Sequence, residues 1–347
     1  AKLSLSNSFE LKEFFPKIQE NVKLSDFNIK INYKNKDFII NGRGNVQLQN
    51  NKDELEFTIN KKNKIYDFKT LLKVQENPIE IKFLDYKKDD NDNAFINIEG
   101  RKILDNKTVL NLISFKEKNN LFKVQDLVFN KKLKIIDLGK FEANYKDIIN
   151  NKNSFKISSK NGTYYLQGKL FNASRLVDSL IDDKVGKKII EKDFKINVLI
   201  EKLFLDEKNF VKKFKGDLLF INEKVTNGNL TGLFSNNEKL VFTIKSIGNE
   251  KITTLFLDRA ETIVRRYKFI KGFNEGVLDF YSTKKGKVSN STLKIYDFKL
   301  KELPTLTKVL TLASLQGIAD VLSGEGIRFN EFEMNFSNKN QLMSINE

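Results

Sequence analysis

Residues 27–34 are Phe-Asn-Ile-Lys-Ile-Asn-Tyr-Lys, a stretch in which every second side chain is large and apolar. Successive side chains of an extended strand point to opposite faces, so this alternation gives one apolar face and one hydrated face. The same period of two recurs at residues 54–60, 79–83, 194–200 and 293–298. We therefore predict a mainly β protein whose strands each have one apolar face.

Clusters of turn-forming residues lie between the alternating segments, as at positions 50–53, 89–93 and 150–153. Asn161-Gly162 and Asn227-Gly228 are typical of tight hairpin turns, because both residue types tolerate positive φ. Many strands joined by hairpins are typical of an antiparallel meander. The predicted fold is therefore an elongated antiparallel meander with a few short helices.

Helical periodicity is confined to four segments. These are residues 8–20, residues 172–184 with Asn172 as N-cap, residues 258–267 with Asp258 as N-cap, and residues 304–322. The last segment is apolar on nearly all sides, and its leucines include Leu306, Leu310, Leu312 and Leu315. A helix of this kind is either buried against the sheet or in contact with lipid, and the sequence leaves both alternatives open.

The residue types that are missing exclude most enzyme chemistry. The chain has no histidine, cysteine or tryptophan. Without histidine the Ser-His-Asp and Cys-His mechanisms are closed. Without either histidine or cysteine, zinc, haem and iron–sulfur sites lose nearly all their usual ligands. Asp89, Asn91 and Asn93 resemble the start of a calcium loop, but Ala94 and Gly100 stand where that loop needs glycine and glutamate. We predict no catalytic centre, no metal and no cofactor.

The formal net charge of +16 comes mainly from lysine, which is mixed with aspartate and glutamate along the whole chain. Proteins that read nucleic acid cluster arginine and stacking aromatic residues, whereas arginine occurs here only at scattered sites such as Arg43 and Arg101. We expect a hydrated surface without a nucleic-acid partner. A mild attraction to anionic lipid surfaces is compatible with the same charge.

Residues 295–336 contain the most distinctive motif of the chain. The sequence IYDFKLKELPTLTKVLTLASLQGIADVLSGEGIRFNEFEMNF combines a strand ending, a proline, and a helix with an LASL core followed by GEGIRF. This combination resembles the C-terminal region of the AsmA-like envelope proteins of double-membraned bacteria, of the YhdP type, with TamB as a more distant relative. The matching positions are Asp297, Phe298, Pro304, Leu310, Ala313, Ser314, Leu315, Gly317, Asp320, Gly324, Gly326, Ile327 and Phe329.

The resemblance extends over residues 122–345. Residues 168–180 are similar to a second element of the family, with Asn172 in place of the usual aspartate, whereas residues 255–277 share the layout but contain LDRAET instead of a small-residue turn. We therefore divide the chain into a β-rich segment, residues 1–121, and an AsmA-like region, residues 122–347. The first segment is expected to continue the hydrophobic groove that the resemblance implies for the second.

The resemblance implies a function in the bacterial envelope. Proteins of this family are periplasmic, are tethered to the inner membrane by an N-terminal segment that this sequence lacks, and move phospholipid between the inner and outer membranes. Their sheet curls into an open hydrophobic groove. We expect a monomer that is a piece of a longer chain. The candidate groove residues are Phe194, Ile196, Val198, Leu293, Ile295, Leu306, Leu310, Leu312 and Leu315.

Two other classes of protein compete with the lipid groove. A non-catalytic structural envelope scaffold would close its sheets into β-sandwich cores. A carbohydrate-active enzyme would need paired carboxylates and aromatic platforms on a concave face, and the absence of tryptophan weakens that alternative. The lipid groove predicts a continuous apolar row without charged interruption, whereas the scaffold predicts only closed cores.

Overall fold

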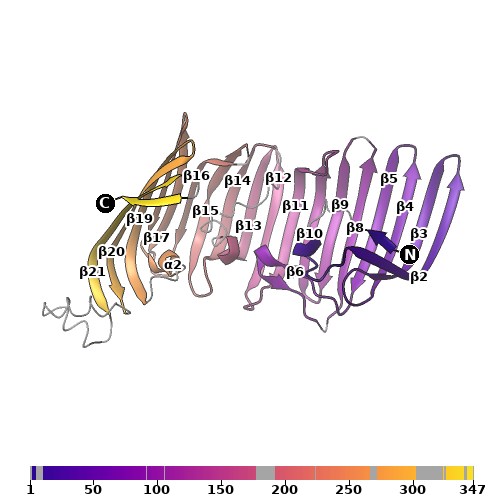
Figure 1. Cartoon of the computed structure of the whole chain (residues 1–347), viewed down its shortest axis with the longest axis horizontal. Coiled ribbons are helices and arrows are strands. Elements are labelled where there is room, and N and C mark those ends of the chain that lie inside the picture. The colour runs from indigo at the N-terminus through magenta and orange to yellow at the C-terminus, as the bar shows by residue number, and fades with distance from the viewer. Residues whose placement is uncertain are drawn as a thin grey trace. The chain divides into compact units, whose positions relative to one another are not determined.

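The computed structural model describes residues 2–4, 11–90, 92–104, 106–176, 192–222, 224–265, 272–301, 323, 326–339 and 342–346. The chain forms two compact units, Ala1–Lys192 (unit 1) and Asp193–Glu347 (unit 2). Each unit is built on an open antiparallel meander (Figure 1), which confirms the predicted mainly β fold with few short helices. The division expected at residues 121 and 122 falls within a single strand of unit 1.

Unit 1 contains one large sheet and a small hairpin. The strands of the large sheet are β1 (Lys2–Ser4), β2 (Asn21–Lys34), β3 (Asp37–Gln47), β4 (Asp53–Lys62), β5 (Ile65–Val74), β8 (Ala94–Ile103), β9 (Thr108–Glu117), β10 (Asn120–Phe129), β11 (Ile135–Lys146), β12 (Lys152–Lys160) and β13 (Thr163–Asn172). Each pairs with the next in this order, always antiparallel. The small hairpin is β6 (Glu80–Ile81) and β7 (Tyr86–Lys87), with the 3-10 helix η2 (Lys82–Leu84) between them, and a further 3-10 turn, η1 (Leu11–Glu13), precedes β2.

Unit 2 is a second meander in which every strand pairs with its sequence neighbour. A short helix, α2 (Glu261–Val264), interrupts the order between its fifth and sixth strands. The strands are β14 (Phe194–Phe204), β15 (Phe210–Ile221), β16 (Lys224–Leu233), β17 (Lys239–Ile247), β18 (Glu250–Leu257), β19 (Phe273–Lys285), β20 (Val288–Leu300), β21 (Ile327–Lys339) and β22 (Leu342–Asn346).

The two faces of each sheet differ in chemistry. Directly paired residues lie on the same face, so the register reveals the composition of each face. On one face of unit 1, cross-strand partners form ion pairs, including Arg43–Glu56 and Lys69–Glu99. On the corresponding face of unit 2, Lys294 pairs with Glu333 at 2.8 Å. We call this side the polar face of each unit, and the opposite side the apolar face.

A capping segment, residues 75–90, buries one edge of the apolar face of unit 1. Tyr86 from this segment packs edge-on against Phe115 and Phe122, with ring centroids 5.5 and 4.9 Å apart. Its hydroxyl donates a hydrogen bond to the Glu117 carboxylate at 2.6 Å, and the Tyr145 hydroxyl donates to the Leu84 carbonyl. Much of the core of unit 1 therefore lies beneath the capping segment.

The core of unit 2 lies at the edge next to α2. There Leu240, Leu257, Leu278 and Ile295 form a row of directly paired residues that are all buried. The backbone N–H of Ala260, just before α2, donates to the Gly276 carbonyl of β19 at 2.7 Å. This bond holds α2 against the end of the sheet.

Some local predictions need correction. Residues 79–83 form only the short β6 and part of η2, because the chain leaves the main sheet to build the capping segment. Asn227-Gly228 lies inside β16 instead of at a turn. Asp258 is not the N-cap of α2, which is Ala260, because the Asp258 carboxylate accepts a hydrogen bond from the Lys239 backbone N–H at 2.6 Å.

Other predictions are confirmed or lie outside the described residues. Asn161 and Gly162 form a turn with φ values of 50° and 74°. The Asn172 side-chain oxygen accepts from the Ser174 backbone N–H at 3.1 Å, as expected of an N-cap, and residues 174–176 are helical. Within residues 8–20, the described helical part is η1. The predicted helix at residues 304–322 lies outside the described ranges.

Candidate functional site

One uncharged row of side chains crosses ten strands of unit 1. Every step in this row is a direct cross-strand pair, so neighbouring members lie roughly 4.8 Å apart and the row is about 43 Å long. None of its members is charged, and Thr70 is its only polar side chain. The row consists of Ile29, Gly42, Phe57, Thr70, Ile98, Ile113, Val124, Phe141, Ile157 and Leu166.

This row is not sealed in the way that the core is. Phe57, Ile98, Val124 and Phe141 are all partly exposed, although they lie on the same face as the buried core residues. At the β2 end the exposure increases, and Ile29 is 51 % exposed. Burying such side chains would gain roughly 25 cal/mol for each Å² of apolar surface removed from water. The row is therefore a surface that an apolar ligand can cover.

A second uncharged row crosses eight strands of unit 2. Its members are again direct cross-strand pairs, and all of them apart from Gly216 are large and apolar. They are Val198, Gly216, Leu230, Phe242, Leu255, Phe280, Leu293 and Met334. Val198 is buried, whereas Leu230, Phe242, Leu255, Phe280, Leu293 and Met334 are partly exposed.

The structure brings together several of the residues proposed from the sequence. Val198 on β14 and Leu293 on β20 belong to the same row of unit 2, six strands apart. Phe194 and Ile196 precede Val198 at alternate positions of β14. On β20, Ile295 comes two residues after Leu293 and belongs to the buried row. Leu306, Leu310, Leu312 and Leu315 lie outside the described residues.

Sequence inspection missed the middle of this row. Phe242 on β17 belongs to an alternating Leu-Val-Phe-Thr-Ile segment that carries the usual strand signal. The signal of β18 is ambiguous, because Ile252 and Phe256 make its opposite face apolar as well as the face of Leu255. The face that Leu255 occupies follows only from its register with Phe242 and Phe280.

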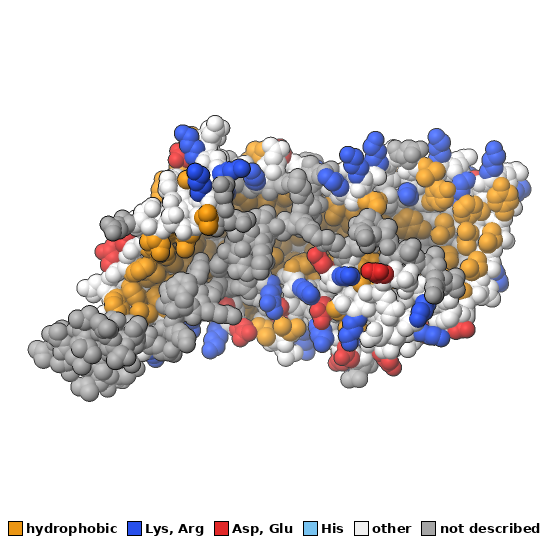
Figure 2. All heavy atoms as spheres, viewed as in Figure 1, with side chains coloured by type: hydrophobic (Ala, Val, Ile, Leu, Met, Phe, Trp, Pro, Cys, Tyr) orange, Lys and Arg blue, Asp and Glu red, His pale blue; other side chains and the backbone are white. Residues whose placement is uncertain are grey.

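The space-filling view shows where apolar side chains reach the surface. In Figure 2, hydrophobic side chains gather over β2 to β5 in unit 1 and over β19 to β21 in unit 2. Basic side chains (Lys or Arg) lie along the hairpin ends of β2 to β5 in the same view. In each unit an accessible apolar surface is therefore present, with charged residues at its border.

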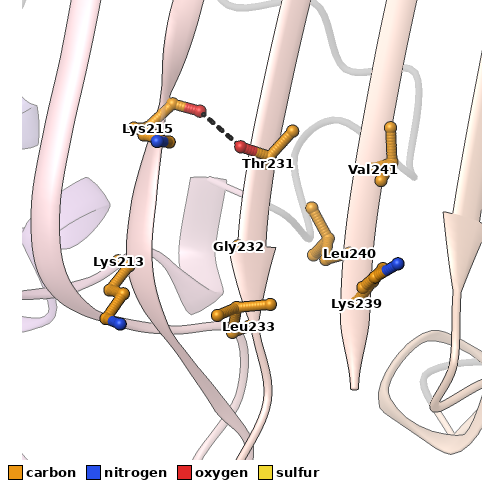
Figure 3. Close-up of a pocket in the computed structure, with 8 residues that line it drawn as sticks. All are labelled: Lys213, Lys215, Thr231, Gly232, Leu233, Lys239, Leu240 and Val241. Carbon is orange, nitrogen blue, oxygen red and sulfur yellow. Dashed lines mark hydrogen bonds between the residues drawn. The ribbon is translucent and has the colours of Figure 1, made fainter. Parts of the chain in front are cut away.

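A pocket of about 260 Å³ lies on β15, β16 and β17 of unit 2. Figure 3 shows Lys213 and Lys215 on one side of it and Lys239 and Val241 on the other, with Thr231 between them. Thr231 and Val241 pair directly and are each one residue away from the apolar row, so they lie on the polar face. This pocket is therefore separate from the uncharged row.

The buried polar groups of the capping segment have structural partners. Glu117 accepts hydrogen bonds from the Tyr86 hydroxyl, the Asp89 backbone N–H and the Asn120 amide. Burial and the bond to Glu117 raise the pKa of Tyr86 well above its ordinary value. Burial also raises the pKa of Asp53, although hydrogen bonds from Asn77 and Gln75 partly offset that effect. These contacts hold the segment on the sheet.

Comparison with known proteins adds no relative. No protein-family model matches the chain, and neither curated proteins nor solved structures give a match. Within the described ranges, no helix combines the length and the apolar character needed to cross a membrane. The described residues also contain no group of three or more acidic side chains placed to hold a metal ion.

Proposed function

We propose that this protein is a non-catalytic lipid carrier that binds phospholipid on the apolar faces of its meanders and conducts it between the inner and outer membranes of a bacterial envelope. The observation that carries the proposal is the uncharged, partly exposed row across ten strands of unit 1. A lipid tail that moved from strand to strand along this row would meet no charged side chain.

The energetics of acyl chains suit such a surface. Each methylene group taken out of water contributes about 0.8 kcal/mol, so a tail of ordinary length needs a long apolar contact to leave a bilayer. The row of unit 1 supplies about 43 Å of such contact. Moving a lipid breaks no covalent bond, and a carrier therefore needs none of the histidine or cysteine chemistry that this composition lacks.

The cellular setting of the proposal comes from the resemblance of residues 122–345 to AsmA-like envelope proteins. That resemblance supports a periplasmic location, attachment to the inner membrane, and phospholipid as the ligand. The uncharged rows support a ligand with an apolar part, and this support is independent of the resemblance because the rows follow only from strand register.

A matched pair of variants tests the proposal. Ile113→Asp places a carboxylate in the middle of the row, whereas Ser114→Asp places the same charge one residue away on the polar face, where Lys123 is its cross-strand partner. The full chain and both variants are produced in the envelope of a Gram-negative bacterium. Bound lipid is identified by native mass spectrometry and lipid extraction, and circular dichroism checks the fold.

We expect phospholipid to copurify with the unaltered chain and with Ser114→Asp. In Ile113→Asp the bound lipid falls at least about tenfold, equivalent to about 1.4 kcal/mol, because a tail must pass a hydrated charge. A stable but lipid-free unaltered chain would contradict the proposal. That result would favour the structural scaffold, for which the sealed core beneath the capping segment is the supporting observation.

A further inference from the structure

Two lysines face each other across neighbouring strands on the apolar face of unit 2. Lys251 on β18 pairs directly with Lys284 on β19, and the residues beyond them in this row are Ser246 and Ser289. Lys224 begins β16 and is close enough to affect Lys251. Burial, followed by the charges of Lys284 and Lys224, lowers the pKa of Lys251 below its ordinary value.

The polar face of the same strands is arranged differently. There Glu250 on β18 is the direct partner of Lys285 on β19, so opposite charges face each other. Like charges in directly opposed positions destabilise a sheet, whereas opposite charges stabilise it. The lysine pair on the apolar face therefore has an electrostatic cost that an anion bound between the two ammonium groups would remove.

Polarity changes in regular steps across this part of the apolar face. On β18, Leu257 is buried, Leu255 is in the partly exposed row, Thr253 has a hydroxyl, and Lys251 is charged. The cross-strand partners on β19 repeat these steps as Leu278, Phe280, Ser282 and Lys284. On β20, Ser291 extends the hydroxyl step, donating to the Ser282 hydroxyl at 2.9 Å.

The steps match the layout of a glycerophospholipid. Alternate residues of a strand are roughly 6.8 Å apart, so the lysines lie about 14 Å from the apolar row. A lipid has its acyl chains, its ester and glycerol oxygens, and its phosphate in the same order. Hydroxyl groups can bond to ester oxygens, and lysine ammonium groups form strong charge-assisted hydrogen bonds to phosphate.

We propose that Lys251 and Lys284 bind the phosphate of a lipid whose acyl chains lie on the row through Leu255 and Phe280. This inference rests on the proposed lipid-carrier function and specifies which lipids the surface prefers. Lipids with a phosphate are held, and neutral lipids with the same tails are held less well.

The test compares two lipids with identical acyl chains, a phosphatidic acid and a diacylglycerol, which differ in the phosphate group. Each is offered in the same nonionic detergent micelles to the delipidated full chain, and native mass spectrometry measures the bound lipid. The double variant Lys251→Gln/Lys284→Gln removes the charged pair, and Lys285→Gln is the control on the polar face. Inorganic phosphate alone is tested in parallel by thermal unfolding.

We expect the unaltered chain and Lys285→Gln to prefer phosphatidic acid by roughly tenfold or more. The double variant should bind both lipids about equally and keep its capacity for diacylglycerol. Equal binding of both lipids by the unaltered chain would overturn the phosphate site but leave the proposed lipid-carrier function intact. A preference for phosphatidic acid that survives in the double variant would have the same two consequences. Stabilisation by inorganic phosphate without a preference between lipids would also overturn it. Binding of neither lipid would overturn the carrier function itself.

Discussion

At the scale of a single residue, the charged Lys251 side chain carries an unfavourable electrostatic energy that a bound anion would reduce. Its pKa is lowered by burial and by the neighbouring Lys284 and Lys224. When folding lowers the pKa of a group, that group favours the folded chain most at a pH above its pKa in the unfolded chain. This stability is lost as the pH falls through the pKa that the group has in the folded chain. At neutral pH the charge of Lys251 therefore opposes folding.

We predict that Lys251→Met raises the thermal unfolding temperature at pH 7. The gain should shrink as the pH approaches and exceeds 10.5, the ordinary lysine pKa, because the unaltered side chain is then neutral in both states. Calorimetric scans between pH 7 and 11 measure the effect. Lys285→Met, opposite Glu250 on the polar face, is the matched control and should show no gain. A pH-independent difference for Lys251→Met would contradict this origin.

At the scale of an element, the capping segment determines where the apolar face of unit 1 is closed. Tyr86 links the segment to the sheet through Glu117, whose carboxylate is buried and accepts three hydrogen bonds. We predict that Tyr86→Phe lowers the free energy of unfolding by about 1.5–3 kcal/mol, the usual effect of removing a hydrogen bond to a charged group. Urea denaturation at pH 7 measures the loss.

The same variant has a distinct pH dependence. The raised pKa of Tyr86 gives stability that is complete below pH 10 and is lost as the pH rises through the folded value, so the difference from Tyr86→Phe should narrow in strong alkali. Tyr281→Phe, at a tyrosine that is 46 % exposed on β19, is the control and should change stability little. Equal losses in the two variants would show that the bond to Glu117 contributes nothing specific.

The elements also show what a sequence can and cannot predict. Alternation alone located the strands at residues 27–34, 54–60, 194–200 and 293–298, because half-buried strands must alternate. The same signal failed at 79–83, where Ile79 and Ile81 are buried because they belong to the capping segment, which is not part of the main sheet. A local period shows that a side chain is buried but does not identify what buries it.

The candidate site was predictable to the same limited extent. Ile196, Val198, Leu293 and Ile295 were found as apolar positions, but their assignment to rows depends on register. Gly228 illustrates the difficulty. It resembles a turn residue, yet a Cβ atom at this position would lie 2.4 Å from Leu218 Cδ2, so the glycine permits close packing within the sheet. Such long-range contacts leave no local signal in the sequence.

At the scale of the molecule, the net charge of +16 is concentrated as well as large. The hairpin edge of unit 1 comprises the turns that join β2–β3, β4–β5, β8–β9, β10–β11 and β12–β13, with the adjoining strand ends. In residues 33–38, 61–66, 102–108, 129–135 and 159–163, eleven lysines occur with two acidic residues, Asp37 and Asp105. Tyr33 and Leu133 on this edge are 69 % and 45 % exposed. Such an edge attracts anionic surfaces through charge.

Lipid held by charge and lipid held by apolar contact should therefore differ in how their binding depends on salt concentration. Screening shortens electrostatic interactions from a range of about 10 Å at 0.1 M salt to about 3 Å at 1 M, whereas burial of acyl chains is not weakened by salt. We predict that the chain cosediments with anionic vesicles at 0.05 M sodium chloride and is largely released at 0.5 M. Lipid that copurified with the chain should stay bound at both concentrations, as measured by native mass spectrometry after exchange into each salt. If salt removed the copurified lipid together with the vesicles, adsorption to lysine would account for both, and the uncharged rows would have no part in holding lipid.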